Sequence, residues 1–304
     1  MRPEPEVITY ARLPRAGLGN KLLVWGRAFA FARTNDLRLF VSPWSQLKVG
    51  PILRGERSAR LYRGYFDDPC AASRVRRLLI RSAYDVVFDP EIARVARPQP
   101  RTAYVFRTVP HWSDYFAGIR EHRAAVHGVL VDMLAPPRKA ELDRLASPII
   151  GVHVRHGDFR PLRDGEDFAR VGQVRTPLAY FRETIEGVRE LHGSALPVTL
   201  FSDGEDRDLA ELLKLPGVRR AQPTADIVDM LLLARSKVII PSPGSSFGMW
   251  SAFLSESPVL WHPSHFHGPS RPADVNQRAY EGPVVGAPSQ WAEQLREEIR
   301  RIER

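Results

Sequence analysis

Three observations predict that the sequence folds as an α/β protein of two domains. The chain has 304 residues, whereas a single domain usually has roughly 100 to 200. Near the amino terminus, the strand-like "EVITYARLP", the glycine loop "RAGLGN", a helical pattern from Lys21 and the strand-like "LRLFVSP" indicate a β-loop-α-β unit. After Pro148, strand-like and helix-like segments alternate regularly, which favours a parallel sheet with crossover helices.

The region between these two patterns is less regular. Residues 45–147 are rich in arginine, with helical stretches predicted near residues 71–83 and 114–134. The region closes in "APPRKAELDRLASP", whose prolines are typical of a domain boundary. We therefore predict a first domain over residues 1–147, a second over 148–287 and a carboxy-terminal amphipathic helix over 288–304.

The elements of the second domain are predicted from apolar runs and helical periodicity. The strands are "IIGVHVRHGD", "PVTLFSDG", "KVIIPSP" and "PVLWHP". The helices are "TPLAYFRETIEGVRELHG", "EDRDLAELLKL", "TADIVDMLLLARS", "SSFGMWSAFLS" and "SQWAEQLREEIRRIER". Thr176 is the expected N-cap of the first of these helices, with Pro177 in its first turn.

The composition is that of a folded protein with a cationic surface. Apolar residues make up 43% and charged residues 26%, and the formal charge of +9 comes from arginines spread along the chain without a basic block. This favours an anionic small ligand over nucleic acid, none of whose common signatures is present. The single Cys70 excludes an internal disulfide and a cysteine-based zinc cluster. The amino terminus lacks the apolar core of a signal peptide, and no apolar stretch is long enough to span a bilayer, so we expect a cytoplasmic protein.

Polar residues follow several of the predicted strands. In open α/β sheets, ligands bind beyond the carboxyl ends of the strands. Three groups lie at such ends: His153, Arg155 and Asp158; Ser202 and Asp203; and the segment 242–246.

Two of these groups suit a diphosphate. The guanidinium of Arg155 offers a planar fork of donors, and "PGSSF", at the start of a helix, offers backbone N–H groups and two hydroxyls. The alternative is that Arg155 forms a buried ion pair with Asp158 and that Ser245 or Ser246 only caps the helix. The nearest approaches to a DxD metal motif, "FDDP" and "DRD", do not lie in a plausible strand-end loop, so Arg155 is favoured over a metal and no metal site is predicted.

Four segments of the chain form a set of motifs in a characteristic order. They are "GLGNKLLVWGRAFAFA", "HWSDYFAGIREHR", "HVRHGDF" and "DMLLLARSKVIIPSPGSSFGMWSAFLS". Together they resemble most closely the bacterial alpha-1,2-fucosyltransferase family, within the wider group that includes alpha-1,6- and protein O-fucosyltransferases. The sequence departs from the family pattern at Lys21, His156 and Phe159, where glutamine, arginine and tyrosine are usual, and it lacks paired tryptophans in the last segment.

This resemblance implies a fold of GT-B type, with two Rossmann-like domains facing a cleft. It implies an inverting, metal-independent transfer of fucose or a related sugar from a GDP-sugar to a glycan hydroxyl, with an alpha-1,2 linkage expected. The first domain would lie on the acceptor side and the second would bind the donor. No cofactor is implied. The partners would be the GDP-sugar and an oligosaccharide or glycolipid acceptor, and nucleic acid would not be one. Peripheral association with a membrane is compatible with this interpretation.

The site residues expected from the motifs and the strand ends fall into three sets. Those expected to be catalytic are Arg155, Asp158 and Asn20. Those expected to bind the donor are Gly17, Gly19, His153, Arg155, Ser202, Asp203, Asp229, Gly244, Ser245, Ser246 and Phe247. Those expected on the acceptor side are Trp112, Asp114 and Tyr115. Two alternatives stay open, namely that His153 is a core histidine and that Asp229 has a surface or capping role.

The base that would accept the acceptor's proton is not assigned by the sequence. Asp158, Asp114, His156 and Glu166 are candidates, and Asp158 is better suited to orienting Arg155 than to abstracting a proton. Other interpretations of the whole chain are a GDP-sugar-binding protein without transferase activity, a transferase with a different GDP-sugar or a protein acceptor, and a nucleic-acid-binding protein.

Overall fold

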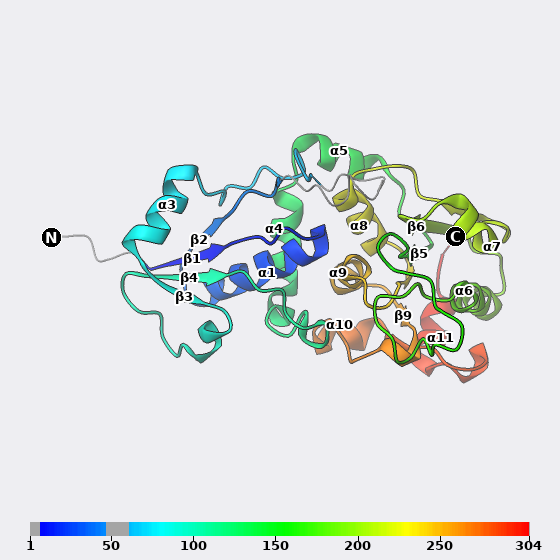
Figure 1. Cartoon of the computed structure of the whole chain (residues 1–304). Coiled ribbons are helices and arrows are strands. Elements are labelled where there is room, and N and C mark those ends of the chain that lie inside the picture. The colour runs from blue at the N-terminus through cyan, green and yellow to red at the C-terminus, as the bar shows by residue number, and fades with distance from the viewer. Residues whose placement is uncertain (1–6, 47–60, 304) are drawn as a thin grey trace. The chain divides into compact units, whose positions relative to one another are not determined.

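The chain divides into two compact units, residues 1–136 and 137–304. The computed structural model describes residues 7–46 and 61–303. Each unit contains one sheet, in which all the paired strands are parallel, with helices packed on it (Figure 1). The predicted α/β class is therefore confirmed, with a parallel sheet in each part of the chain.

The sheet of the first unit has the strand order β2-β1-β4-β3. Its strands are β1 (Ile8–Ala11), β2 (Arg38–Val41), β3 (Asp85–Phe88) and β4 (Thr102–Phe106). Because successive side chains of a strand point to opposite faces, Tyr104 and Phe106 face helix α1 (Leu18–Thr34), where Phe31 contacts both rings. Tyr10, Phe40 and Val105 face the other way and pack against Ile80 of helix α3 (Arg74–Ala83).

The rest of the first unit is built from short helices. They are η1 (Glu91–Arg94), η2 (Trp112–Asp114), η3 (Arg120–His122) and α4 (Arg123–Asp132). The helical stretch predicted near residues 114–134 is thus broken into η2, η3 and α4. Strands β3 and β4 were not predicted, although the run "TAYVF" of β4 is buried throughout.

The sheet of the second unit has the strand order β10-β9-β8-β5-β6-β7. Its strands are β5 (Ile150–Val154), β6 (Val198–Ser202), β7 (Val218–Arg220), β8 (Val238–Ile240), β9 (Val259–Trp261) and β10 (Glu281–Pro283). The four predicted strands are present, and β7 and β10 are additional. The buried aliphatic side chains of β5, β6 and β8 form the centre of the core.

Helices and short 3-10 turns connect these strands. They are α5 (Pro136–Arg144), α6 (Leu178–His192), η4 (Asp206–Leu209), α7 (Ala210–Leu213), α8 (Asp226–Ala234), α9 (Ser246–Leu254), η5 (Pro263–His265), α10 (Ala273–Arg278), η6 (Pro288–Gln290) and α11 (Glu293–Arg300). The carboxy-terminal helix α11 packs on α6 and belongs to the second unit.

Two local predictions can be compared with the structure. The segment expected to be a boundary, "APPRKAELDRLASP", contains helix α5, which begins at Pro136 because the first turn of a helix needs no N–H donor from that residue. Along the sequence, the first compact unit ends at Pro136, inside this segment. The functional division at residue 147 stays a prediction. Thr176 is not an N-cap: helix α6 begins at Leu178 after Pro177, and the buried Thr176 hydroxyl has no hydrogen-bond partner among the described residues.

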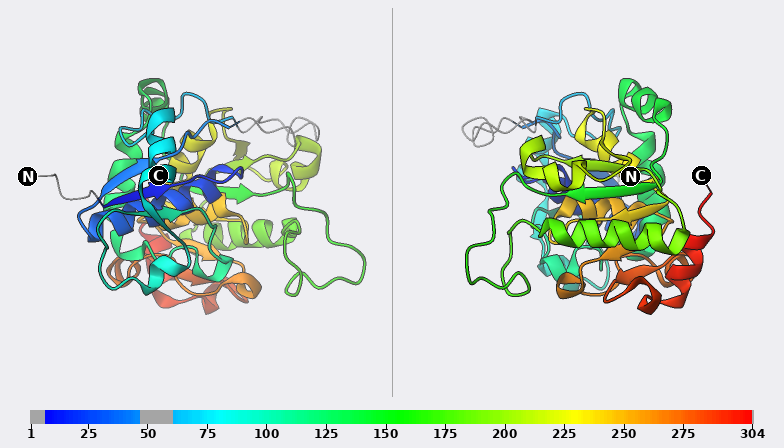
Figure 2. Two further views of the ribbon diagram at one scale, coloured as in Figure 1. Left: turned by 60° about the vertical axis from the view of Figure 1, so that its left-hand side comes forward. Right: turned by 90° about the vertical axis from the view of Figure 1, so that its right-hand side faces the viewer.

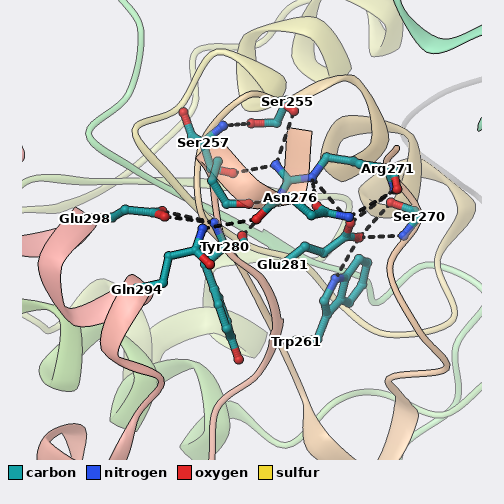
Figure 3. A network of polar contacts seen from close by, with 11 residues as sticks. Ser255, Ser257, Trp261, Ser270, Arg271, Asn276, Tyr280, Glu281, Gln294 and Glu298 are labelled. Carbon is teal, nitrogen blue, oxygen red and sulfur yellow. Dashed lines mark hydrogen bonds and ion pairs between the residues drawn. The ribbon is translucent and has the colours of Figure 1, made fainter. Parts of the chain in front are cut away.

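A buried arginine connects the edge strand β10 to neighbouring segments of the second unit through hydrogen bonds and an ion pair. The Arg271 guanidinium donates hydrogen bonds to four backbone carbonyls in the segments 255–257 and 279–280, and its Nε lies 3.3 Å from Glu281 Oε2 (Figure 3). Glu281 in turn accepts from Ser270 and Trp261. Both charged side chains are fully buried. Every donor and acceptor named here is matched, which is the condition for burying such a pair.

Candidate functional site

The strand order of the second unit contains a topological switch point. From β5 the chain proceeds through β6 and β7 on one side of the sheet, and then through β8, β9 and β10 on the other. The carboxyl ends of β5 and β8 therefore adjoin at the position where open α/β sheets bind ligands. The backbone N–H of Arg155 donates to Ser242 Oγ at 2.8 Å and joins the loops that follow these two strands.

Arg155 is held between two carboxylates. Its Nη1 donates to Asp203 Oδ2 and its Nη2 to Asp158 Oδ1, each at 2.5 Å. The predicted contact with Asp158 is present, but the pair is not buried, since the Asp158 side chain is 46% exposed and that of Arg155 19%. The two ion pairs fix the plane of the guanidinium at the switch point.

Gly157 makes this arrangement possible. Asp203 Oδ1 also accepts from the backbone N–H of His156 at 2.8 Å, so the carboxylate lies against the loop. A Cβ at position 157 would overlap Asp203 Oδ2 and stand 3.3 Å from the Arg155 Cζ, and the backbone there has φ of +20°. The sequence reasoning did not single out Gly157, because the need for glycine arises only from the folded position of Asp203.

His153 is a neutral, buried histidine beside the start of α9. It is 4% exposed, its ring stacks on Phe247 with centroids 5.0 Å apart, and its Nδ1 has no hydrogen-bond partner in the described parts of the chain. Burial lowers the pKa of His153 to about 3, with Asp203 opposing this shift and Arg155 adding to it. The ring can therefore offer a hydrogen bond at neutral pH but no positive charge.

The segment 243–246 leads from β8 into α9 with its first turn uncapped. Ser245 occupies the N-cap position, but its side chain makes no capping hydrogen bond. The first N–H groups of a helix have no intrahelical partners and form the positive end of its dipole. Gly244 has φ of +69°, the left-handed conformation that favours glycine, and a Cβ there would meet nothing within 4 Å. Half-buried Ser246 is the first residue of the helix.

Two predicted donor-binding residues are used within the fold. Ser202 Oγ accepts from the backbone N–H of Gly204 at 3.0 Å and closes the turn after β6. Asp229 lies in the first turn of α8 and accepts from Thr224 Oγ1 at 2.5 Å. Burial raises the pKa of Asp229 to about 7, the hydrogen bond from Thr224 opposes this, and the charges of Asp226 and Glu141 add to it. None of these neighbours of Asp229 belongs to the strand-end cluster, which consists of His153, Arg155, Asp158, Ser202, Asp203 and the segment 242–246.

A long loop follows β5 and Arg155 and projects away from the sheet of the second unit (Figure 2). Arg160 makes a two-pronged ion pair with Glu166 inside this loop, at 2.6 and 2.8 Å. The Phe168 ring packs against the rings of His262 and His265 at the end of β9, and the Phe168 carbonyl lies 2.8 Å from His265 Nε2. The loop is therefore stabilised internally by this ion pair and anchored at Phe168 to the segment that follows β9.

The candidates for a general base differ in their surroundings. The hydrogen bond from Arg160 lowers the pKa of Glu166 to about 2, which makes this carboxylate a weak base. Burial lowers the pKa of His156, whose Nδ1 lies 3.8 Å from Asp208 Oδ2, so its imidazole is neutral at pH 7. Asp158 is engaged with Arg155.

The expected residues of the first unit lie in three local structures. Gly17 is the N-cap of α1, and Gly19 and Asn20 belong to its first turn. The buried Oδ1 of Asn20 accepts no hydrogen bond from a described residue. Trp112 and Asp114 are exposed in η2, and burial raises the pKa of Tyr115, which follows them.

The acidic pairs nearest to a DxD motif have structural partners. Asp68 accepts from Trp44 Nε1 at 2.9 Å and from the N–H of Cys70 at 2.8 Å, and Asp206 pairs with Arg220 at 2.8 Å. Within residues 7–46 and 61–303, no group of three or more His, Cys, Asp or Glu side chains is placed to hold a metal ion. None of the helices in these ranges is both long and apolar enough to cross a membrane.

A groove of about 310 Å³ lies on another part of the second unit. It is formed by α6 together with the segment that leads into α11, and Glu183, Glu186, Glu190 and Trp291 are among its lining residues. None of its lining residues belongs to the strand-end cluster.

The chain thus consists of two parallel α/β units, and the second has a cluster of charged and polar side chains at its switch point. No protein-family model and no curated protein sequence matches the chain. Among solved structures, the chain is similar to NodZ of Bradyrhizobium, an alpha-1,6-fucosyltransferase crystallised with GDP, at 17% identity and a TM-score of 0.49 over 83% of this chain and 93% of NodZ.

Two further solved structures are similar to the chain. The Arabidopsis thaliana protein FUT1 in complex with GDP is 14% identical, with a TM-score of 0.49 over 90% of this chain and 72% of that one. POFUT1 in complex with GDP is 11% identical, with a TM-score of 0.46 over 86% of this chain and 99% of that one.

Proposed function

We propose that the chain is a glycosyltransferase that moves fucose or a related sugar from a GDP-sugar to a hydroxyl group of a glycan. The observation that carries the proposal is the convergence of the fixed Arg155, the neutral His153 and the uncapped start of α9 at the switch point of the second unit. The resemblance of the motifs around Asn20, Arg155 and Ser246 to fucosyltransferases supports the choice of donor.

The proposed reaction breaks the bond between the anomeric carbon of the sugar and the oxygen of the β-phosphate. The bonding electrons pass to the diphosphate, whose growing negative charge must be stabilised. In this proposal, Arg155 and the first N–H groups of α9 donate hydrogen bonds to it. The acceptor oxygen attacks the opposite face of the sugar and loses its proton to a base or to water, which inverts the anomeric centre.

The finer points of the proposal rest on the sequence motifs. We propose that transfer needs no metal ion, because arginine and backbone donors can take the place of a bridging cation at the diphosphate. An alpha-1,2 linkage, a cytoplasmic location and an acceptor bound by the first unit through Trp112, Asp114 and Tyr115 complete the proposal. Asn20 is proposed to act on the acceptor side as well.

The experiment is a screen of GDP-sugars, with GDP release and glycan transfer measured in the presence of excess EDTA. We expect turnover with GDP-fucose or a related GDP-sugar. Arg155→Ala should abolish it while the melting temperature changes little, and Arg155→Lys should rescue poorly because lysine lacks the planar fork. The matched control is Arg170→Ala, since the side chain of Arg170 is 85% exposed in the same loop and pairs only weakly with Asp167 at 3.5 Å.

Three outcomes would contradict parts of this proposal. Near-normal turnover of Arg155→Ala would remove Arg155 from the mechanism. Loss of activity in EDTA that Mg²⁺ or Mn²⁺ restores would indicate a metal-bridged diphosphate. Binding of GDP without turnover of any GDP-sugar would favour a binding protein, and equal thermal stabilisation by ADP, UDP and GDP would argue against a guanine nucleotide as ligand.

A further inference from the structure

Helix α3 of the first unit presents an apolar stripe to the outside. Ile80 is its one buried residue and packs with Tyr10 and Phe40 on the sheet. By contrast Val75, Leu78 and Leu79 are 66%, 65% and 45% exposed. Their spacing of three and four residues places them side by side along one line of the helix, and the helical period puts this line on the side away from Ile80. No described residue covers this line, although a surface helix usually turns its apolar residues toward the core.

Arginines border the apolar stripe. Arg74 and Arg81 are exposed and lie on the same side of the helix as Leu78, while Arg76 and Arg77 are half-buried beside Ile80. In the part of the chain that the structure describes, Arg74, Arg77 and Arg81 belong to no ion pair. The helix therefore combines exposed aliphatic side chains with positive charges that are not neutralised by neighbours.

The net charge of the whole chain is concentrated in the unit that carries α3. Residues 1–136 contain 22 Lys and Arg against 12 Asp and Glu, whereas residues 137–304 contain 22 against 23. The arginines are spread along the sequence as expected, but the acidic residues are not. The first unit thus carries the entire positive excess and generates the longer-ranged field.

We propose that α3 docks the protein on a lipid bilayer that contains anionic lipids. The stripe of Val75, Leu78 and Leu79 enters the boundary between headgroups and acyl chains, and Arg74 and Arg81 contact the lipid phosphates. The helix has 10 residues, which is too short to span a bilayer, so it lies in the plane of the surface. This inference goes beyond the proposed function and does not depend on it.

The observations favour a bilayer over other anionic or apolar partners. Nucleic acid would attract the arginines, but it offers no apolar environment for three exposed aliphatic side chains. A protein partner would need a groove shaped to this convex helix, whereas an anionic bilayer accommodates an isolated amphipathic helix and matches the charge of the whole first unit.

The test is sedimentation of the full-length protein with lipid vesicles. Vesicles of neutral phosphatidylcholine are compared with vesicles in which about a third of the lipid is phosphatidylglycerol, at low and at physiological salt. We expect binding to the anionic vesicles that weakens as salt rises, because the electrostatic part is screened. Binding that is absent, or equally strong on neutral vesicles, would overturn the proposal.

Two variants separate the apolar and the charged contributions. Joint replacement of Val75, Leu78 and Leu79 by serine should lower the partition coefficient at least tenfold, or about 1.4 kcal/mol. Its control is Val285→Ser, because Val285 is 63% exposed on the second unit. The replaced side chains are exposed, so the melting temperature of each variant should stay close to that of the original chain.

The charge variant replaces Arg74 and Arg81 by serine, with exposed Arg219 and Arg300 replaced in its control. We expect weaker vesicle binding and a smaller salt dependence of that binding when Arg74 and Arg81 are replaced, and neither effect in the control. Equal binding by the serine variants and the original chain would overturn the proposal. Analytical ultracentrifugation tests whether a second copy of the chain covers the stripe instead. If the original chain is a dimer, the triple serine variant is a monomer and neither binds vesicles, the stripe joins two copies of the chain and the proposal is overturned.

Discussion

The replacement Asp229→Asn tests how a buried carboxyl of the second unit is used. The pKa of Asp229 is raised from 3.8 to about 7, chiefly by burial. Each unit of pKa difference between the folded and the unfolded chain corresponds to 1.36 kcal/mol. At a pH where the carboxyl is ionised in both, its burial therefore lowers the free energy of unfolding by about 4 kcal/mol.

The sign of the effect follows from the two pKa values. Well below the unfolded value of 3.8, the carboxyl is protonated in the folded and the unfolded chain, and the penalty is absent. Between the unfolded value of 3.8 and the folded value of about 7, the folded chain binds the additional proton, so its stability falls as the pH rises. From pH 5 to pH 8 this loss amounts to about 3 kcal/mol.

Asparagine keeps the size of the side chain and an oxygen that can accept from Thr224, but it does not ionise. We therefore expect the advantage of the Asp229→Asn variant in free energy of unfolding to grow by about 3 kcal/mol between pH 5 and pH 8. Urea denaturation at the two pH values measures it, with the exposed Glu293→Gln as charge-matched control. An advantage that is the same at both pH values would refute the reasoning.

The same variant decides whether Asp229 contacts the donor. Calorimetric titration with GDP should give an affinity close to that of the original chain if Asp229 acts only within α8, where Thr224 is its hydrogen-bond partner. A loss of tenfold or more at both pH values would place the carboxyl at the nucleotide, as the motif match suggests.

Three further replacements test the structure elsewhere in the second unit. Gly157→Ala should lower GDP affinity at least tenfold in calorimetry, because its Cβ would displace Asp203 from Arg155; unchanged affinity would contradict this. Ser246→Ala should weaken GDP binding by roughly 1 to 2 kcal/mol, the size of a hydrogen bond to a charged group, and a loss of stability with full affinity would indicate a helix cap instead. Arg271→Met should lower the free energy of unfolding by about 3 to 5 kcal/mol, because it strands a buried carboxylate, and a near-neutral result in urea would contradict that.

The strand ends of the second unit could be predicted because each carries a local signal. "IIGVHVRHGD" and "KVIIPSPGSSF" join a buried run to a polar turn, and the strand order brings the two turns together. The contact of Arg155 with Asp203 could not be predicted in the same way, since these residues are 48 positions apart. It depends on β5 and β6 being neighbours in the sheet.

The elements that were missed lack a signal of their own. Strand β10 has the sequence "EGP", which no propensity marks as a strand, and it is held by the buried pair of Arg271 and Glu281. Helix α5 lies in the segment expected to hold the domain boundary, and its two initial prolines hide the helical pattern. Strand β10 therefore depends on tertiary contacts. Helix α5 depends on the position of its prolines, because a proline that would break a helix interior is tolerated in the first turn.

The two carboxylates around Arg155 have a consequence for the kinetics of ligand binding. A free arginine side chain loses about 1.5 to 2 kcal/mol of conformational entropy when it becomes fixed. Here that ordering accompanies folding, because Asp158 and Asp203 hold the guanidinium through contacts within the fold. An incoming diphosphate would then meet a preorganised receptor, so its association should follow a single exponential whose rate rises linearly with ligand concentration, without the plateau that a slow rearrangement produces.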